Sequence, residues 1–189
     1  MKLEMLKKSL KEAPIVKIID YDYVIHPITD GIPEIKPELL GEVTFEMQKM
    51  LERCEQIDKL VTIEAMGIPL ATALSLKMNI PFMIIRKRKY DLPDEISVEQ
   101  KTGYSKSQLY INGLKRGDRI AIVDDVLSTG GTLKAVLTTL KTMGVIVRCV
   151  IIAVDKSNIA KKIMDETNVN IQSIINIEVA NGKVIIKNV

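Results

Sequence analysis

The sequence predicts an α/β fold, a doubly wound and mainly parallel sheet in one domain of 189 residues. Short runs rich in valine and isoleucine alternate with segments whose apolar residues recur at helical spacing, as in strand–helix–strand units. This length is enough to bury one substantial core. Several polar loops also follow the apolar runs directly. In such sheets the carboxyl ends of the strands form the ligand-binding edge, so we expect these loops to lie together.

The predicted elements alternate along the whole chain. Helices are predicted where apolar residues recur every three or four positions, namely over residues 2–13, 37–53, 68–77, 133–143 and 160–166. Strands are predicted over residues 15–19, 59–63, 80–85, 107–111, 120–123, 145–154 and 171–177. A hairpin over residues 179–186 turns at Asn181 and Gly182. Residues 20–37 and 91–106 are predicted as irregular chain.

Composition and charge argue against several classes of function. A net charge of +3 is too small to indicate a nucleic-acid surface. No stretch is long and apolar enough to cross a membrane, and the acid-containing N-terminus is unlike a signal or transit peptide. Cys54 and Cys149 lie far apart and fit no metal-binding spacing, so we expect reduced cysteines in a cytoplasmic protein.

The segment 119–132 carries the strongest functional signal. An apolar strand runs into Asp124 and Asp125, and a loop of small residues then leads into a helix. The loop residues are Ser128, Thr129, Gly130, Gly131 and Thr132. Small residues let backbone N–H groups approach a phosphate, and a helix N-terminus adds partial positive charge. The two carboxylates would repel a bare phosphate, so they suit ribose hydroxyls or a Mg²⁺ that also holds a pyrophosphate.

Two further loops follow predicted strands. The first consists of Glu64, Ala65, Met66 and Gly67, and the second contains the basic run 86–89. Taken alone, the first fits an ordinary strand–helix turn and the second a solvated basic surface. At the ligand-binding edge of the sheet, their backbone N–H groups and cations would suit a pyrophosphate.

These segments together resemble the type I phosphoribosyltransferases, most closely the archaeal-type hypoxanthine/guanine enzymes. The resemblance implies that 5-phosphoribosyl pyrophosphate (PRPP) places its 5-phosphate on the loop 128–132 and its ribose at the catalytic residues Asp124 and Asp125. It implies a pyrophosphate site made of Glu64, Ala65, Met66, Gly67, Arg86, Lys87 and Lys89. Mg²⁺ is the implied cofactor, held mainly by PRPP, with Asp124 and Asp125 as candidate ligands.

The resemblance also implies two covering segments. A hood, mainly residues 14–37, would cover the base with Val24 and His26, and a flexible catalytic loop, residues 90–106, would carry the catalytic Tyr104. Lys156 would contact the base, because members selective for 6-oxopurines often have lysine there and an ammonium donates to an oxo group. On residue type alone, however, His26 is a buried ring with satisfied partners and Lys156 is a solvated lysine.

The sequence departs from the family pattern at three places. Met66 stands where the adenine enzymes have arginine or lysine, which removes one positive charge from the pyrophosphate loop. Gly103 stands where they have a glutamate before the tyrosine. Ser128 replaces an acid that assists the base in many 6-oxopurine enzymes, so the resemblance assigns no general acid or base.

The implied function is purine salvage by a homodimer. The enzyme would transfer 5-phosphoribosyl from PRPP to hypoxanthine, and to guanine, giving IMP or GMP and pyrophosphate. The same reaction on adenine stays open, whereas orotate is disfavoured because the hood and Lys156 both indicate a purine. A non-catalytic PRPP-sensing regulator is the alternative of another class, although the segment before Pro14 is too short for a helix-turn-helix. Turnover with PRPP and Mg²⁺ separates an enzyme from such a regulator.

Overall fold

The computed structural model of the chain describes residues 3–18, 21–98 and 108–187. Its helices are α1 (Glu4–Glu12), α2 (Pro27–Asp30), α3 (Pro37–Leu51), α4 (Gly67–Met78), α5 (Gly131–Met143) and α6 (Ala160–Thr167). Its strands are β1 (Ile15–Ile18), β2 (Tyr21–Val24), β3 (Lys59–Ile63), β4 (Phe82–Ile85), β5 (Ile96–Val98), β6 (Leu109–Ile111), β7 (Arg119–Leu127), β8 (Ile146–Asp155), β9 (Ile171–Ala180) and β10 (Lys183–Lys187).

The main sheet has six strands in the order β10-β9-β8-β7-β3-β4. Five of these strands, β4, β3, β7, β8 and β9, run parallel to one another. β10 pairs antiparallel with β9 as the predicted C-terminal hairpin. The chain moves outward from β3 to β4 and then returns to β7 on the other side of β3, so the strand order reverses between β3 and β7. This confirms the predicted doubly wound α/β fold and marks that point as the place for a ligand.

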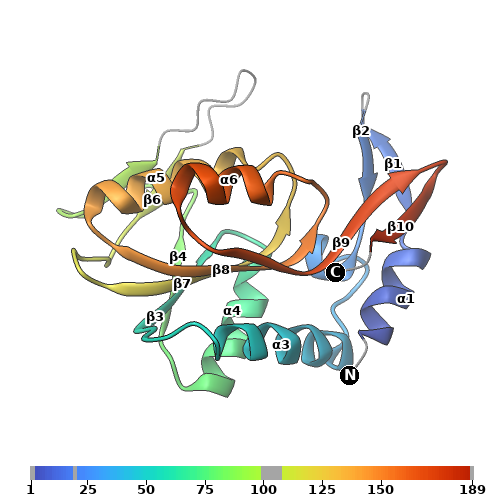
Figure 1. Ribbon diagram of the computed structural model, residues 1–189, viewed down its shortest axis with the longest axis horizontal. Helices are drawn as coiled ribbons and strands as arrows, with labels where there is room; N and C mark the ends of the chain where they lie inside the picture. Colours follow the sequence, from blue (N-terminus) through green and yellow to red (C-terminus); the bar gives the residue numbers. More distant parts are fainter. Residues whose placement is uncertain (1–2, 19–20, 99–107, 188–189) are drawn as a thin grey trace.

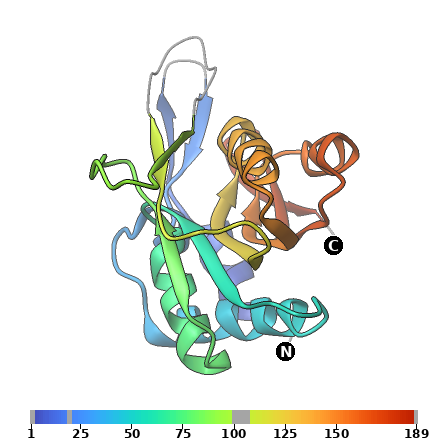
Figure 2. The ribbon, with the colours of Figure 1, turned by 90° about the vertical axis from the view of Figure 1, so that its left-hand side faces the viewer.

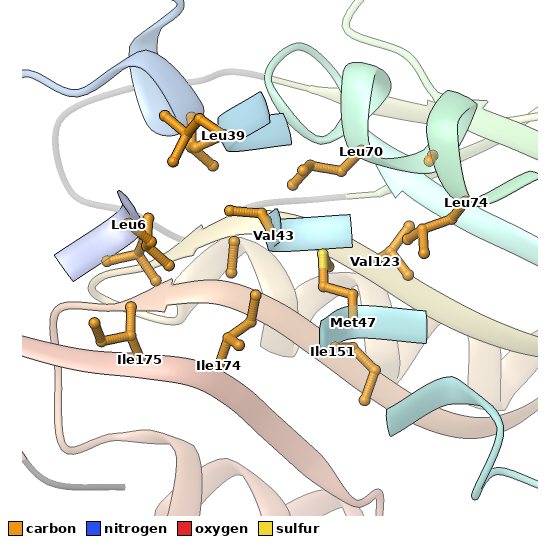
Figure 3. Packing of buried hydrophobic residues seen from close by; sticks show 14 of the residues in the cluster. Leu6, Leu39, Val43, Met47, Leu70, Leu74, Val123, Ile151, Ile174 and Ile175 are labelled. Carbon is orange, nitrogen blue, oxygen red and sulfur yellow. The ribbon is translucent and has the colours of Figure 1, made fainter. Parts of the chain in front are cut away.

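Helices cover both faces of the sheet, with α5 and α6 on one face and α3 and α4 on the other (Figure 1). Val43 and Met47 of α3 reach toward Leu70 of α4 and Ile151 of β8 in the larger core cluster (Figure 3). Burial on both faces explains why the middle strands are almost continuously apolar. The core thus holds the strands rigidly behind the loops at their carboxyl ends.

The hood is more regular than the sequence analysis expected. Residues 20–37 were predicted as irregular chain, but they contain β2, which pairs antiparallel with β1, and the short helix α2. The prolines in this segment lie outside the paired strand, so they do not interrupt its hydrogen bonds. The hood hairpin stands beside the β9–β10 hairpin (Figure 1), and a cavity of about 310 Å³ lies between them.

The second segment predicted as irregular, residues 91–106, also contains a strand. β5 pairs antiparallel with β6 in a separate two-stranded sheet. These strands lie at the end of the molecule opposite the hood hairpin (Figure 1), and Figure 2, which is viewed from that end, shows them in front of it. Residues 99–106 of the expected catalytic loop, Tyr104 included, lie outside the described residues.

The expectation of unpaired cysteines is wrong. Cys54, just after α3, forms a disulfide with Cys149 of β8, although 95 residues separate them in the chain. Packing of α3 on β8 brings the two together, which no local spacing pattern could show. Among the described residues, no helix has both the length and the apolar character needed to span a membrane.

Candidate active site

The predicted phosphate, ribose and pyrophosphate residues meet at the carboxyl ends of β3 and β7. Two adjoining cavities, of about 200 and 270 Å³, share Asp124 and Thr132 in their walls. The smaller one follows the loop 128–132, and the larger one reaches Glu64 and Lys87. A larger hollow of about 390 Å³ lies between α5 and α6, away from these strand ends. The strand-end cavities are therefore the candidate active site.

The loop 128–132 is held tightly against α6. Gly130 has φ +72°, a conformation that side chains rarely adopt, and a Cβ there would lie 2.6 Å from Ile163 Cδ1. Helix α5 begins at the next residue, Gly131, so its first backbone N–H groups have no partners within the helix. The loop therefore has the geometry of an anion site at a helix N-terminus.

The loop after β3 packs equally closely on β7. A Cβ on Gly67 would collide with Thr62 Oγ1 and lie 2.6 Å from Asp124 Oδ1. The side chain of Met66 lies beside Gly31 of the hood, since a Cβ on Gly31 would come within 3.3 Å of its Cε. Met66 therefore contacts the hood, while the backbone of this loop stays at the strand ends where a pyrophosphate is expected.

Asp124 and Asp125 lie within β7 and not after it, because β7 continues to Leu127. The prediction of a strand ending at Val123 is thus corrected. Asp124 Oδ1 accepts a hydrogen bond from the backbone N–H of Asp125, at 3.1 Å. Burial raises the pKa of both carboxyls, and the negative charge of Asp125 raises the pKa of Asp124 further. Such a pair is stabilised by hydroxyl donors or a cation, which compensate for lost solvation.

The basic segment after β4 divides between two environments. Glu64 accepts a hydrogen bond from the backbone N–H of Lys87, at 2.9 Å. Its Oε2 lies 3.2 Å from Arg86 Nε, an ion pair without hydrogen-bond alignment. Lys87 lines the larger cavity together with Glu64. Lys89 instead pairs with Asp91 at 2.5 Å, and that carboxylate raises the pKa of Lys89.

Lys156 connects the main sheet to the hood. It follows β8 in a tight turn, where Asp155 accepts hydrogen bonds from the backbone N–H and the hydroxyl of Ser157, at 2.7 and 2.8 Å. Its Nζ lies 3.3 Å from the carbonyl oxygen of Val24. Burial lowers the pKa of Lys156, and the carboxylates of Asp30 and Asp125 partly oppose that effect. Lys156 is therefore a half-buried ammonium at the hood rather than a solvated surface lysine.

His26 has a structural position inside the hood. Its side chain is completely buried, and Nδ1 accepts a hydrogen bond from the backbone N–H of Ile28 at 3.2 Å. Nε2 must then carry the proton, which it donates to Ser9 Oγ at 2.8 Å. Burial lowers the pKa of His26 to about 4, and nearby Lys156 contributes. Both ring nitrogens are thus engaged within the protein, so we assign His26 to holding the hood instead of touching the base.

Comparison with known proteins points to one enzyme family. Residues 34–183 match the phosphoribosyl transferase domain. The chain is 50% identical over 182 residues to the hypoxanthine/guanine phosphoribosyltransferase of Methanothrix soehngenii, covering 96% of this chain and 95% of that protein. It is 52% identical over 184 residues to the enzyme of the same name from Methanobacterium paludis, covering 97% and 96%.

The chain belongs to the phosphoribosyltransferase family. Its fold is also similar to that of adenine phosphoribosyltransferase from Thermoanaerobacter pseudethanolicus, with a TM-score of 0.76 and 24% identity over 92% of this chain and 99% of that one. That likeness supports the type I phosphoribosyltransferase fold predicted from the sequence.

The oxygen donors of this phosphoribosyltransferase fit Mg²⁺. The ion prefers oxygen ligands and usually binds through one or two carboxylates together with substrate phosphates. Asp124 and Asp125 line the larger cavity beside the loop 64–67, and their raised pKa values mark carboxyls that a cation would stabilise in the ionised form.

Sequence reasoning missed two sets of residues around the site. Thr62 is fully buried, and its hydroxyl has no hydrogen-bond partner within the described part of the chain. Tyr23 and Asp30 of the hood and Ser9 of α1 form a hydrogen-bonded group with His26. The only sequence signal for the second set was the concentration of polar and aromatic residues in the segment 20–37.

Proposed function

We propose that the chain is a purine salvage enzyme that transfers 5-phosphoribosyl from PRPP to N9 of hypoxanthine and guanine. In the reaction, the imidazole ring of the purine gives up a proton, and N9 forms a bond to the ribose C1 atom as the bond from C1 to pyrophosphate breaks. The relatives that share about half of their residues with this chain carry the name of this activity. The choice of a 6-oxopurine depends on one structural observation, the position of Lys156.

An ammonium at the hood discriminates between purines through hydrogen bonding. Lys156 only donates, and its Nζ lies 3.3 Å from the carbonyl oxygen of Val24. The oxo group of hypoxanthine or guanine accepts a hydrogen bond, whereas the 6-amino group of adenine donates one. Adenine would leave a half-buried ammonium facing a donor, which is unfavourable. Val24 and Lys156 are therefore the base contacts that we propose.

The remaining residues would bind PRPP. We assign the 5-phosphate to the loop 128–132, and the ribose hydroxyls to Asp124 and Asp125. Lys87 and the backbone of the loop 64–67 would hold the pyrophosphate, with Arg86 fixed behind them by Glu64. Lys89 faces Asp91, so we give it a minor part. Mg²⁺, when bound with PRPP, would neutralise the leaving pyrophosphate.

The test compares purines on the purified protein with PRPP and Mg²⁺. We expect kcat/KM for hypoxanthine and guanine to exceed that for adenine, and Lys156→Gln to narrow the gap at least tenfold, since it adds an acceptor to the site. Lys161→Gln is the matched control, because Lys161 is exposed on α6. A preference for adenine in the wild type, or an unchanged ratio in Lys156→Gln, would reject the choice of a 6-oxopurine.

The same assay also tests whether the chain is an enzyme at all. No pyrophosphate release with any base would favour the non-catalytic regulator. The homodimer and the cytoplasmic location stay predictions, and analytical ultracentrifugation tests the first of them.

A further inference from the structure

Asp30, at the end of α2, carries a partly buried negative charge that the proposed reaction does not use. Its Oδ1 accepts a hydrogen bond from the Tyr23 hydroxyl at 2.7 Å. Its Oδ2 accepts from Thr29 Oγ1 at 2.6 Å and from the backbone N–H of His26 at 2.9 Å. Burial alone would raise the pKa of Asp30, but these hydrogen bonds and Lys156 lower it below its usual value. Asp30 is therefore ionised at neutral pH.

Tyr23 links this carboxylate to Lys156. The hydroxyl of Tyr23 is held by Asp30, and Lys156 Nζ lies over the Tyr23 ring, 5.1 Å from its centroid. That distance is within the range of a cation–π interaction. Tyr23 precedes Val24, whose carbonyl oxygen accepts from the same ammonium. The hood thus surrounds Lys156 with an aromatic face, a carbonyl and the field of a carboxylate.

The charges around Lys156 act in different directions. Burial lowers its pKa, while Asp30 and Asp125 raise it. Asp125 belongs to the PRPP side of the site, so in the hood the favourable charge comes from Asp30. Asp22 and Glu178 line the cavity between the two hairpins together with Lys156. Glu178 is paired with Lys187 at 2.5 Å, and Asp22 is exposed.

We propose that Asp30 is a positioning residue for base selection. This inference rests on the proposed function. Asp30 orients the Tyr23 ring through the phenol hydroxyl and attracts the Lys156 ammonium, so that the ammonium is held where it presents its donors to the base. The preference for 6-oxopurines then depends on a residue that touches neither substrate.

Two variants separate the contribution of the Asp30 charge from that of the Tyr23 hydroxyl. Asp30→Asn keeps the shape and one acceptor oxygen but removes the charge, and we expect it to lower the hypoxanthine-to-adenine ratio of kcat/KM roughly tenfold, as for one lost charge interaction of moderate strength. Tyr23→Phe keeps the ring and removes the hydroxyl, and should lower the ratio about threefold. Both should raise KM for hypoxanthine while KM for PRPP stays unchanged. Glu34→Gln is the matched control, because Glu34 is an exposed acid of the hood.

The deciding experiment repeats Asp30→Asn in the Lys156→Gln background. If Asp30 acts through Lys156, the second substitution adds no further change in the hypoxanthine-to-adenine ratio. An equal fall of the hypoxanthine-to-adenine ratio in both backgrounds would overturn the inference, as would an unchanged ratio in Asp30→Asn. If Asp30→Asn does not fold, an unchanged ratio in Tyr23→Phe overturns it instead. Failure of the proposed function looks different, because wild type and Lys156→Gln would then already show the same ratio.

Discussion

The two ends of the candidate active site are built in different ways. At the phosphate end, the loop 128–132 follows β7 and begins α5, so its binding groups are neighbours in the chain. At the hood end, Lys156 of the main sheet meets Val24 across 132 residues of sequence. The proposed phosphate donors at the first end are backbone N–H groups. The second end consists of side chains whose directions depend on partners such as Asp30 and Ser9.

Under the proposed assignments, this difference matches what each kind of ligand requires. A phosphate needs several donors at one point, which a small-residue loop at a helix start provides locally. A purine edge needs a donor of one kind at one place, and a flexible lysine provides that only when other groups hold it. Substitutions at the phosphate end should therefore change PRPP binding alone, and substitutions in the hood should change base binding alone.

Gly67→Ala should have the largest effect on activity, because it would distort the loop 64–67, where the pyrophosphate of PRPP is expected. A Cβ would collide with Thr62 Oγ1 and Asp124, and both belong to central strands that cannot easily shift. We expect a cost of about 3 kcal/mol in the loop, or roughly a hundredfold in kcat/KM for PRPP. Steady-state kinetics measures this. Gly41→Ala is the control, since nothing lies within 4 Å of its added Cβ, and full activity of Gly67→Ala would contradict the packing.

Lowering the pH should reduce the stability of the protein through His26 in the hood. Its pKa falls from 6.5 to about 4 on folding, so the folded state binds the proton less tightly than the unfolded state. Stability from neutral His26 is complete above the unfolded pKa and is lost as the pH falls toward the folded pKa. Between about pH 7 and pH 5 the loss should be on the order of 2 kcal/mol.

Urea unfolding of wild type and His26→Asn at the two pH values isolates this contribution. Asparagine keeps an acceptor for the N-terminus of α2 but does not titrate. The carboxyls present in both proteins cancel in the difference. A pH dependence that is the same in both proteins would mean that His26 is not the group responsible.

Thr129→Asp sharpens the comparison at the phosphate end. It places a carboxylate against the expected 5-phosphate, and we expect KM for PRPP to rise at least tenfold, about 1.4 kcal/mol. KM for hypoxanthine should not change. Thr138→Asp puts the same charge on an exposed position of α5 and should leave both constants unaltered. An unchanged KM for PRPP in Thr129→Asp would show that the loop does not bind the phosphate.

Ser9→Ala should have the smallest effect, at the hood end. Removing the hydroxyl leaves His26 Nε2 without its acceptor from α1, which costs about 1 kcal/mol of stability. KM for the base should rise a few-fold, which is what about 1 kcal/mol corresponds to. KM for PRPP should stay constant. Thr72→Ala is the control, as its exposed hydroxyl donates only to a carbonyl of its own helix. A rise in KM for PRPP alone would refute this division of the site.

The sequence by itself determined the α/β fold, the strand-end loops and the acid pair. Each of these depends on residues close together in the chain, where hydrophobic period and loop composition are visible directly. The loop 128–132 and the pair Asp124 and Asp125 were found this way, and their roles in binding stay predictions.

Only the tertiary structure decided the hood, the disulfide and the surroundings of Lys156. β2 and α2 lie in a segment rich in proline, whose local pattern indicates irregular chain. The role of His26 depends on Ser9 in another helix, and the pKa of Lys156 is raised by Asp30 in the hood. Hydrogen bonds and burial of this kind join residues far apart in sequence, and a linear pattern contains no information on which of them will meet.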